Sequence, residues 1–376
     1  MYLAIIDYKT RLVLDMIKTY DFVQYVDEFS GSGSFQINVP MSDDAFAYLV
    51  RSNFVFFEEG IVGVIESCKD SQDEEKQVIV TGKLTNSILS YRSLLKTERY
   101  NAAIAAIARS LVEKHFIQPT DEKRKIDCIA LATDEKYNPA SEKIAFCDTG
   151  TDVCQSISKM FLPYGYGFEL YPVIEDCNAQ QDAANLTSLE FRVLKPVDRT
   201  IDNTEGNTPV VFAFQLNNLS RLEYEEDGST YCSMAIVASE GTGSERKTLE
   251  VGDMEMTGLD RIELYVDARD IQSENEDGTT ISDEELYSLM KQRGLEKLEE
   301  HGIFLSFSGS VLVSGDNRYV YGKDFYKGDY VSVIDEVRNR IFDLQITSVT
   351  KSISQGVEHF DIDFGLDRLT VRRLVG

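Results

Sequence analysis

Tryptophan is absent from this sequence of 376 residues, which excludes folds that depend on a buried Trp. Long apolar runs are missing too: the longest, residues 102–108, is far shorter than the ~18 residues of a membrane-spanning helix. The amino terminus carries a charge at Asp7 and has no small-residue cleavage site, so it does not match a signal peptide. We therefore expect neither a membrane anchor nor a leader peptide.

Basic residues are scarce. The sequence holds 38 Lys and Arg against 64 Asp and Glu, which gives a formal net charge of -26. Such a surface repels the phosphates of nucleic acids, so we expect no stable nucleic-acid binding. The acidic residues are spread along the whole chain, which is typical of a self-repelling surface rather than an interaction tail. Hydrophobic residues still make up 43%, which predicts a folded protein with a sizeable core.

Paired motifs for metals and disulfides are also missing. The sequence has no Cys-x-x-Cys pair and no His-Glu-x-x-His motif, and its three histidines are far apart. We therefore predict no metal site, and we favour reduced thiols in a protein assembled in the cytosol over a disulfide framework. The residues concerned are His115, His301 and His359, and Cys68, Cys128, Cys147, Cys154, Cys177 and Cys232.

Short runs of β-forming residues occupy both ends of the chain. Over residues 1–92 they recur about every 10 residues without an intervening helix, which indicates a sandwich or a barrel. The predicted strands are 2–7, 12–18, 22–27, 34–40, 53–58, 61–66, 77–82, 167–174, 188–195, 210–216, 222–224, 231–237, 304–309, 310–315, 319–322, 329–335, 341–353 and 357–365.

The middle of the chain has the periodicity of amphipathic helices. Residues 101–117 predict one helix with Asn101 as its N-cap. Residues 152–161 predict a second, capped by Thr151 and followed by helix-stopping Pro and Gly. Together with the strands that follow, these helices indicate an α+β region.

The clearest helix signal lies later, over residues 283–300. Ser282 and Glu285 form a capping box, in which each side chain can satisfy a backbone N–H of the other. Gly294 interrupts this helix, and at that point the apolar stripe turns to another face; a Gly there costs about 1 kcal/mol relative to Ala.

Residues 240–246, EGTGSER, hold two glycines beside hydroxyl residues, as phosphate-binding loops do. The Lys of a Walker motif is missing, and Arg246 stands where a dinucleotide fingerprint needs a third Gly. We therefore interpret the segment as a turn in which Gly241 and Gly243 adopt angles that other residues resist. Glu240 and Arg246 are expected to pair across it.

Other stretches carry weaker signals. Residues 273–284 resemble a calcium loop, but Ser273 replaces the first Asp, and a polar turn before a capped helix explains the same letters. Residues 162–171 are rich in aromatic residues, which suggests sugar stacking, although a turn feeding a buried strand is the simpler interpretation. No Gly-x-Ser-x-Gly motif occurs. We predict no catalytic, cofactor-binding or metal-binding residues.

A series of motifs nevertheless follows one order along most of the chain. The first are GSFQINVP (33–40), GIVGVIE (60–66), VTGKLTNSILSYR (80–92), GTDVCQSI (150–157) and GYGFELYP (165–172). They are followed by LSRLEYEEDGSTYCSMAIVASEGTGSER (219–246), GLDRIELYVDARDI (258–271), DEELYSLMKQRGLEKLEEH (283–301), YGKDFYKGDYVSVID (321–335) and ITSVTKSI (346–353). This order resembles the phage tail hub family, which comprises siphophage tail-hub proteins and shares its fold with the baseplate hubs of contractile tails and injection systems.

The resemblance implies a mainly β fold with α+β insertions and two antiparallel β-barrels of baseplate-hub type, the second discontinuous. It implies a first barrel at 1–95, an α+β domain at 96–209, a second barrel at 210–240 and 306–376, and an inserted, partly helical domain at 241–305. On this basis residues 240–246 mark the point where the chain leaves the second barrel for the insertion.

The resemblance also implies a non-enzymatic structural hub, without cofactor, in a phage, prophage or phage-like injection particle. A homotrimeric ring would join the tail tube to the tip and pass the tape measure and DNA through an acidic channel. The implied partners are distal tail or tail-tube proteins and a tail-tip spike, fibre or tape-measure protein. The implied location is the tail tip or baseplate of the virion, after assembly in the bacterial cytoplasm.

Two alternative functions stay open from the residues alone. One is a carbohydrate-binding tail-tip module that uses Tyr164, Tyr166 and Phe168. The other is a peptidoglycan hydrolase with an unrecognised carboxylate site, since a sequence with 64 acids always brings some carboxylates together.

Overall fold

The computed structural model describes residues 3–58, 60–71, 76–176, 184–242, 246–273, 280–302, 304–311, 319–354 and 356–365. Strands dominate it, and the α-helices lie in the middle of the chain and in one later segment, so the predicted mainly β fold with α+β insertions is confirmed. Four hydrophobic clusters fill the interior: one in each half of a large sheet, one around the first two helices and one beneath the third.

The first seven strands form one half of the large sheet, and within it they pair antiparallel. Buried positions alternate along β3, so that Val23, Tyr25 and Asp27 face the interior. A carboxylate in such a row needs a partner, because an unpaired buried charge is costly. The strands are β1 (Leu3–Ile6), β2 (Val13–Ile17), β3 (Phe22–Glu28), β4 (Ser34–Pro40), β5 (Phe54–Glu58), β6 (Ile61–Ser71) and β7 (Gln77–Leu84).

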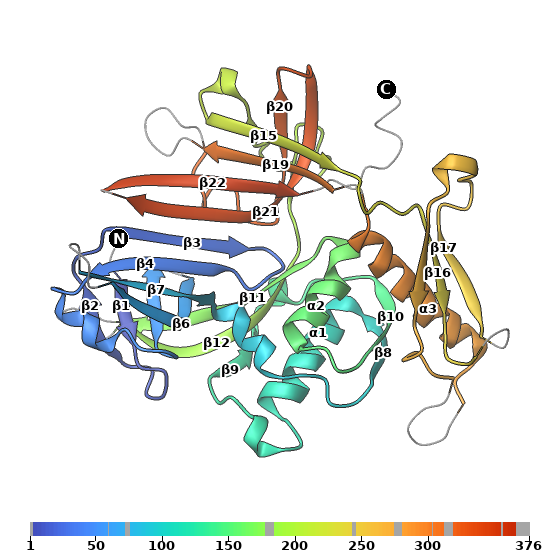
Figure 1. Cartoon of the computed structure of the whole chain (residues 1–376), viewed down its shortest axis with the longest axis horizontal. Coiled ribbons are helices and arrows are strands. Elements are labelled where there is room, and N and C mark those ends of the chain that lie inside the picture. Colours follow the sequence, from blue (N-terminus) through green and yellow to red (C-terminus); the bar gives the residue numbers. More distant parts are fainter. Residues whose placement is uncertain are drawn as a thin grey trace.

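The last strands form the other half, and one long strand belongs to both. β21 (Arg340–Ser354) pairs with β20 through its first residues and with β22 through the rest, while its residues 348–354 also pair with β3. β21 and β3 lie side by side in Figure 1, so the two halves meet along this ladder. The other strands are β13 (Asp198–Arg199), β14 (Val211–Phe212), β15 (Leu219–Asp227), β19 (Phe304–Val311), β20 (Tyr330–Asp335) and β22 (Val357–Gly365).

The strand order of the large sheet is open. It runs β15-β19-β22-β21-β3-β4-β7-β6-β5-β1-β2, with β13 and β14 attached through β20. Over the residues that the structure describes, β2 pairs with β1 alone and β15 with β19 alone, so neither half closes into a barrel. Over the described residues the two expected barrels are thus seen as two open halves of one sheet, which are joined where β21 pairs with β3.

The α+β segment lies against this sheet. β8 (Glu98–Ala103) pairs with β10 (Lys143–Asp148), and β9 (Ile129–Leu131), β11 (Gly167–Asp176) and β12 (Ala184–Leu194) form a second small sheet. α1 (Ile104–Val112) and α2 (Val153–Phe161) contribute their apolar faces to the cluster that also contains these strands (Figure 1). A single π-helical turn, Glu113–Ile117, extends α1.

The first helix begins later than predicted. Asn101 is not an N-cap, because it pairs with Ala145 in the β8–β10 ladder. The helix therefore starts at Ile104, after that ladder ends. The hydroxyl of Ser141 accepts a hydrogen bond of 3.1 Å from the backbone N–H of Ala105, and so takes the place of a local cap.

The cap of α2 is also shifted by one residue. The carboxylate of Asp152 accepts a hydrogen bond of 2.9 Å from the backbone N–H of Gln155. Thr151, the predicted cap, instead donates its hydroxyl proton to Asp148. A carboxylate suits this position because the N-terminal end of a helix carries partial positive charge.

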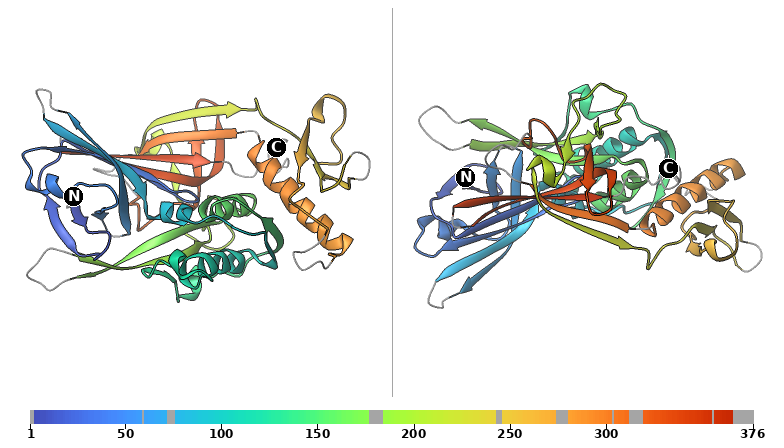
Figure 2. Two further views of the ribbon diagram at one scale, coloured as in Figure 1. Left: turned by 60° about the horizontal axis from the view of Figure 1, so that its bottom comes forward. Right: turned by 90° about the horizontal axis from the view of Figure 1, so that it is seen from above.

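The third unit combines a small sheet with the longest helix. β16 (Met234–Ala238) lies between β17 (Thr248–Gly252) and β18 (Glu263–Asp267), and α3 (Asp283–Glu300) packs on this sheet. The unit stands at the opposite end of the molecule from β1 and β2 in every view (Figure 1; Figure 2). The predicted cap of α3 is confirmed, since the Ser282 hydroxyl accepts a hydrogen bond from the N–H of Glu285.

Gly294 sits where α3 lies close to β16 and β17. A Cβ at this position would lie 2.7 Å from Cγ2 of Val251 and 3.0 Å from Cγ2 of Val237. The glycine that interrupts the helical pattern therefore allows close packing. Leu295 and Leu298, which follow it, pack against the same hydrophobic cluster as the earlier leucines of α3.

Candidate functional site

A cleft of about 1100 Å³ lies where the two halves of the large sheet meet the α+β segment. Its walls come from β3, the β5–β6 turn, β11, β12 and residues 319–329, which precede β20. Aromatic rings and charged side chains of both signs share the lining. The cleft therefore joins segments that lie far apart in the sequence.

A buried lysine links three of these segments. Nζ of Lys327 lies 2.5 Å from Oδ1 of Asp27 on β3 and 3.7 Å from Oε2 of Glu169 on β11. Burial alone would lower the pKa of Lys327, but the charges of Asp27 and Glu169 outweigh it, so the pKa lies above its ordinary value. The Lys stays protonated, and Asp27 gains the partner that its buried position requires.

A second lysine crosses the same junction. Nζ of Lys351, on β21, lies 2.8 Å from Oε2 of Glu58 on β5 and 2.9 Å from Oε1 of Glu358 on β22. The hydroxyl of Tyr25 also donates a hydrogen bond to Glu58. Burial and the charge of Glu58 raise the pKa of Tyr25, so this phenol remains a donor.

Arg192 completes the network on β12. Its guanidinium carbon lies 3.5 Å from the ring centroid of Tyr171 and 4.3 Å from that of Tyr137, which are cation–π contacts. The same group donates hydrogen bonds to Glu169 at 3.3 Å and to Glu190 at 3.1 Å. Glu169 therefore connects Arg192 with Lys327.

This cleft is built to hold parts of the chain together. Lys327, Lys351 and Arg192 each contact at least two carboxylates. The described residues that line it include no Ser, Thr, Cys or His, so they provide no hydroxyl or thiol nucleophile beside an imidazole base. Glu169, Lys327 and Lys351 lie in motifs of the tail-hub resemblance, but no local pattern indicated that they form a cluster, because the contacts join positions up to 300 residues apart.

The EGTGSER segment has a different role from the expected one. It connects β16 to β17, which are antiparallel neighbours, so it is a hairpin loop within the small sheet and not the junction between a barrel and an insertion. Gly241 has a φ of 111°, as the turn prediction requires, while Gly243 lies outside the described residues. The prediction of a turn rather than a phosphate site agrees with this hairpin.

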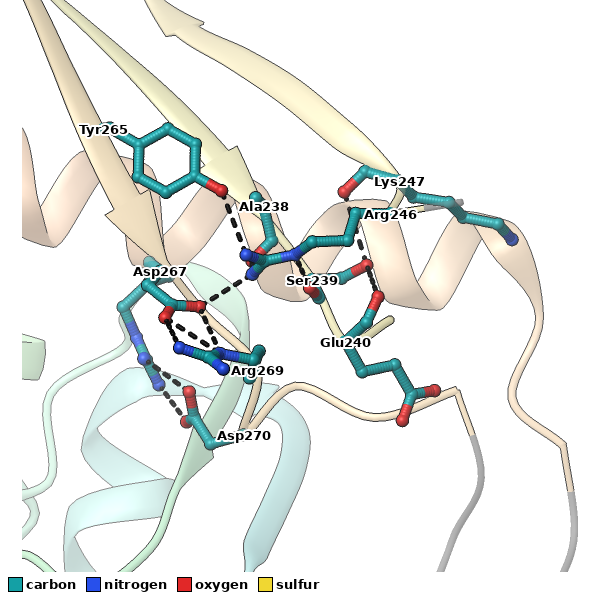
Figure 3. Close-up of polar contacts among 10 residues, drawn as sticks. Ala238, Ser239, Glu240, Arg246, Lys247, Tyr265, Asp267, Arg269 and Asp270 are labelled. Atoms are coloured by element: carbon teal, nitrogen blue, oxygen red, sulfur yellow. Dashed lines mark hydrogen bonds and ion pairs between the residues drawn. The ribbon is translucent and has the colours of Figure 1, made fainter. Parts of the chain in front are cut away.

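The prediction that Glu240 and Arg246 pair across the turn is wrong. Arg246 donates to the carbonyls of Ala238 and Ser239, each at 2.7 Å, and to Oδ1 of Asp267 at 2.7 Å. Glu240 points away from it in Figure 3 and accepts a hydrogen bond of 2.6 Å from the backbone N–H of Ser273. The backbone carbonyls of Ala238 and Ser239, at the end of β16, lie closer to Arg246 than the carboxylate of Glu240 does.

Asp267 is the centre of this small network. Arg269 and Arg246 both donate to its carboxylate and lower its pKa to about 2 (Figure 3). The adjacent Asp270 accepts a hydrogen bond of 2.8 Å from Arg293 on α3. The network therefore ties the β16–β17 hairpin to β18, and the segment after β18 to α3.

The aromatic residues considered for sugar binding belong to the interior. Phe168 is fully buried and lies edge-on to Phe161. Tyr166 is buried and donates to Glu142 at 3.2 Å, while Tyr164 donates to Gln292 at 2.9 Å. Phe168 and Tyr166 thus present no exposed ring for stacking on a sugar.

The histidines and the described cysteines are dispersed over the structure. His115 is buried beside Glu98, His301 caps the end of α3, and His359 is exposed on β22. The five described cysteines form no disulfide, and Cys177 lies outside the described residues. Half of the calcium-like stretch 273–284, residues 274–279, also lies outside them. Across the described ranges no group of three or more His, Cys, Asp or Glu side chains is placed to hold a metal ion.

A smaller cleft of about 270 Å³ separates α3 from β10 and α2. Glu296 lies in it, hydrogen-bonded at 3.0 Å by Gln292 and 3.9 Å from Nε of Arg293. Burial raises the pKa of Glu296 to about 7, and Asp148 and Glu300 act in the same direction, while Gln292 and Arg293 oppose it. This carboxyl group therefore changes charge near neutral pH.

Three solved structures share this fold over nearly the whole chain. A prophage tail protein from Listeria monocytogenes EGD-e is 12% identical, with a TM-score of 0.53, and the match covers 100% of this chain and 97% of the other. A 43 kDa tail protein of a Shewanella oneidensis prophage is 12% identical, with a TM-score of 0.53 and coverage of 97% and 98%. A tail protein from Neisseria meningitidis MC58 is 14% identical, with a TM-score of 0.51 and coverage of 97% of each chain. At these identities the likeness establishes the fold, which is that of phage tail proteins.

Sequence comparison gives the family. A search of curated proteins finds no match. The family model described as Siphovirus ReqiPepy6 Gp37-like protein matches residues 2–366, and the chain therefore belongs to that family. The resemblance to phage tail proteins that the ordered motifs indicated is confirmed. In the described part of the chain, no helix has the length and apolar character needed to cross a membrane.

Proposed function

We propose that this chain is a structural hub protein at the tail tip or baseplate of a phage, a prophage or a phage-derived injection particle. The observation that carries the proposal is that the fold of prophage tail proteins extends over the whole chain. The ion pairs of the large cleft support it, because they stiffen the junction between segments instead of forming a reaction site. The protein in this proposal is not an enzyme and uses no cofactor or metal.

The proposed assembly is a ring of three copies around a channel. Each chain supplies two strand-rich halves, so three chains supply six, which suits a sixfold tail tube on one side and a threefold tip on the other. The net charge of -26 supports a channel that DNA and the tape measure pass through without binding. A trimer whose channel is lined by basic residues would contradict this part of the proposal.

We assign the first half of the sheet to residues 1–95 and the α+β domain to 96–209. We assign the second half to the residues from 210 up to a point before Met234, together with 306–376. β16 pairs with β17 and β18 and with no strand of the large sheet in the described residues. The insertion therefore begins before Met234, earlier than the expected boundary at residue 240.

The proposed partners follow from the position in the particle. Distal tail or tail-tube proteins would bind one face of the ring, and a spike, fibre or tape-measure protein the other. The proposed location is the tail tip of the virion, with assembly in the cytoplasm of the bacterial host. No membrane anchor and no stable nucleic-acid contact are part of this assignment.

A mass measurement in solution, combined with negative-stain imaging, tests the proposal. We expect a mass of three copies of the 42.5 kDa chain and a closed ring in the images. A stable single copy that binds a glycan with saturation would favour a binding module instead. Loss of peptidoglycan turbidity that disappears when one acidic residue is replaced would show a hydrolase.

A further inference from the structure

The large sheet ends at an acidic edge. Among the described residues β15 pairs with β19 alone, so its second edge has no strand partner there. β15 is 9 residues long, and an exposed edge of this length is a template for another strand. Two copies of this same edge would repel each other, because it carries Glu223, Glu225, Glu226 and Asp227.

The two faces of β15 differ in character. Leu222 and Tyr224 are half-buried and pack against the hydrophobic cluster of the second half of the sheet. Glu223 and Glu225 alternate with them, so they project from the opposite face, where both are exposed. Arg221 pairs with Glu223 on that face. A strand that fits this edge needs apolar side chains on one face and cations on the other.

One segment of this sequence has that pattern. Residues 366–376, LDRLTVRRLVG, follow β22 directly and hold three Arg and one Asp in a chain that is otherwise strongly acidic. In an extended strand Arg368 and Arg372 share one face, whereas Leu369 and Val371 share the other, because side chains alternate. Over residues 368–372 the segment thus has the same apolar alternation as β15 with the opposite charge, whereas beyond them Arg373 falls on the face of Leu369 and Val371 and Leu374 on the face of the arginines.

We propose that residues 366–376 of a neighbouring copy of this chain pair with the free edge of β15. The added strand extends the large sheet from one copy to the next, with Arg368 and Arg372 on the face of Glu223 and Glu225 and with Leu369 and Val371 beside the hydrophobic cluster. This inference rests on the proposed ring, since it supplies a contact between neighbouring copies.

The geometry of β22 favours a neighbour over the same chain. Tyr224, Phe307 and Phe364 stand in one row across β15, β19 and β22, so the chain leaves β22 level with the acidic end of β15. To reach its own free edge it would cross three strand spacings, about 14 Å. At that end of the sheet β15 and β19 both connect to the unit of β16 and α3 (Figure 1), so a strand that returned to its own free edge would have to pass these connections.

A charge exchange in the full chain tests the pairing. The first variant carries Glu223→Arg and Glu225→Arg, and the second carries Arg368→Glu and Arg372→Glu. Each alone places like charges opposite one another, so we expect the dissociation constant of the assembly to rise about tenfold or more, measured by light scattering across a concentration series. In an equimolar mixture a ring of three can have opposite charges at two of its three contacts, so its assembly should recover in part, whereas a chain with all four substitutions restores all three contacts and should assemble like the unmodified chain.

The outcomes separate clearly. Recovery in the mixture supports the pairing, and unchanged thermal unfolding of each variant shows that both are folded. If each variant associates as strongly as the unmodified chain, the pairing of residues 366–376 with β15 is wrong, while the ring proposal stands. If the mixture stays weak and only a chain with all four substitutions recovers, the segment pairs within its own chain and the proposal is wrong. An unmodified chain that never associates overturns both the ring and this contact.

Discussion

Lys327 and Asp27 are 300 positions apart in the sequence, yet Nζ of the Lys and Oδ1 of the Asp lie 2.5 Å apart in the wall of the large cleft. Their side chains are only 10% and 8% exposed. The pair therefore fixes residues 319–329 against β3, and through Glu169 it also holds β11. We expect the rigidity of the contact between residues 319–329, β3 and β11 to depend on this one cation.

Removing that cation should be strongly destabilising. In Lys327→Met, Asp27 is left buried without its partner, and we expect the free energy of unfolding to fall by about 3–5 kcal/mol in a urea titration. Lys323→Met, at an exposed position nearby, is the matched control and should change it little. The double variant Lys327→Met with Asp27→Leu should recover much of the loss, because apolar groups can replace a buried ion pair. A Lys327→Met protein as stable as the control would contradict the clamp.

Gly294→Ala should destabilise α3 although Ala is the better helix former. The helix gains about 1 kcal/mol in propensity, but the new Cβ would lie 2.7 Å from Val251, and relieving such overpacking costs about 1–3 kcal/mol. We expect a net fall in the melting temperature. Ser288→Ala, on the exposed face of the same helix, should leave it unchanged or raise it slightly. A rise in Gly294→Ala would show that the sheet yields easily at this point.

Glu98 should make the protein sensitive to acid. Burial works to raise the pKa of Glu98, yet His115, whose Nε2 lies 3.2 Å from Oε1 of Glu98, and the hydrogen bond from Lys114 lower it to about 2. A carboxyl group whose pKa is lowered on folding stabilises the fold above its unfolded value of 4.5, and that stability disappears as the pH falls toward 2. In Glu98→Gln the thermal midpoint should drop at pH 7 and depend less on pH between 4.5 and 2.

The control for this acid dependence is Glu122→Gln, which neutralises an exposed carboxylate in the same segment of the chain. It should keep the midpoint at pH 7 and the acid dependence of the unmodified protein. If Glu98→Gln and Glu122→Gln behave alike, the cluster of Glu98, His115 and Lys114 does not stabilise the fold.

Glu296 should make the fold less stable as the pH rises through neutrality, which is the opposite of the effect of Glu98. Its pKa is raised to about 7, mainly by burial, so the folded state holds its proton more tightly than the unfolded state and loses stability as the pH rises. We expect the unmodified protein to lose about 1 kcal/mol of stability between pH 6 and pH 8 through this group. Glu296→Gln should remove that loss, as measured by hydrogen exchange of the α3 amides at the two pH values.

The comparison for Glu296 is Glu284→Gln, which removes an equal charge from the exposed start of α3. Its α3 amides should keep the pH dependence of the unmodified protein. Equal protection of α3 at pH 6 and pH 8 in the unmodified protein would contradict the assignment.

Local sequence signals predicted local structure well. The short runs of β-forming residues at 22–27 and 34–40 identified β3 and β4, and the capping box at Ser282 located the start of α3 to the residue. Such signals depend on positions a few residues apart, so a single sequence contains them. The N-cap of α1 failed for the opposite reason, because Asn101 is held by a strand 44 positions later, through Ala145.

The features that join distant segments could not be predicted. The pairing of β21 with β3, the contact of Lys327 with Asp27 and the choice of Asp267 over Glu240 by Arg246 all depend on the final arrangement in space. With 64 acidic residues in the chain, a basic residue has many possible partners, and sequence proximity favoured the wrong one at Arg246.

The shared strand β21 has a mechanical consequence. A pull that slides the two halves of the sheet past each other loads the ladder between residues 348–354 and β3 along its length. All of its hydrogen bonds then carry the load together, whereas a pull at one end would break them in turn. The ion pair between Lys351 and Glu58 adds a further link between the two halves beside that ladder. The two halves should therefore move as one rigid body. A twisting force applied at one end of the molecule is then transmitted to the other end, because no hinge between the halves absorbs it.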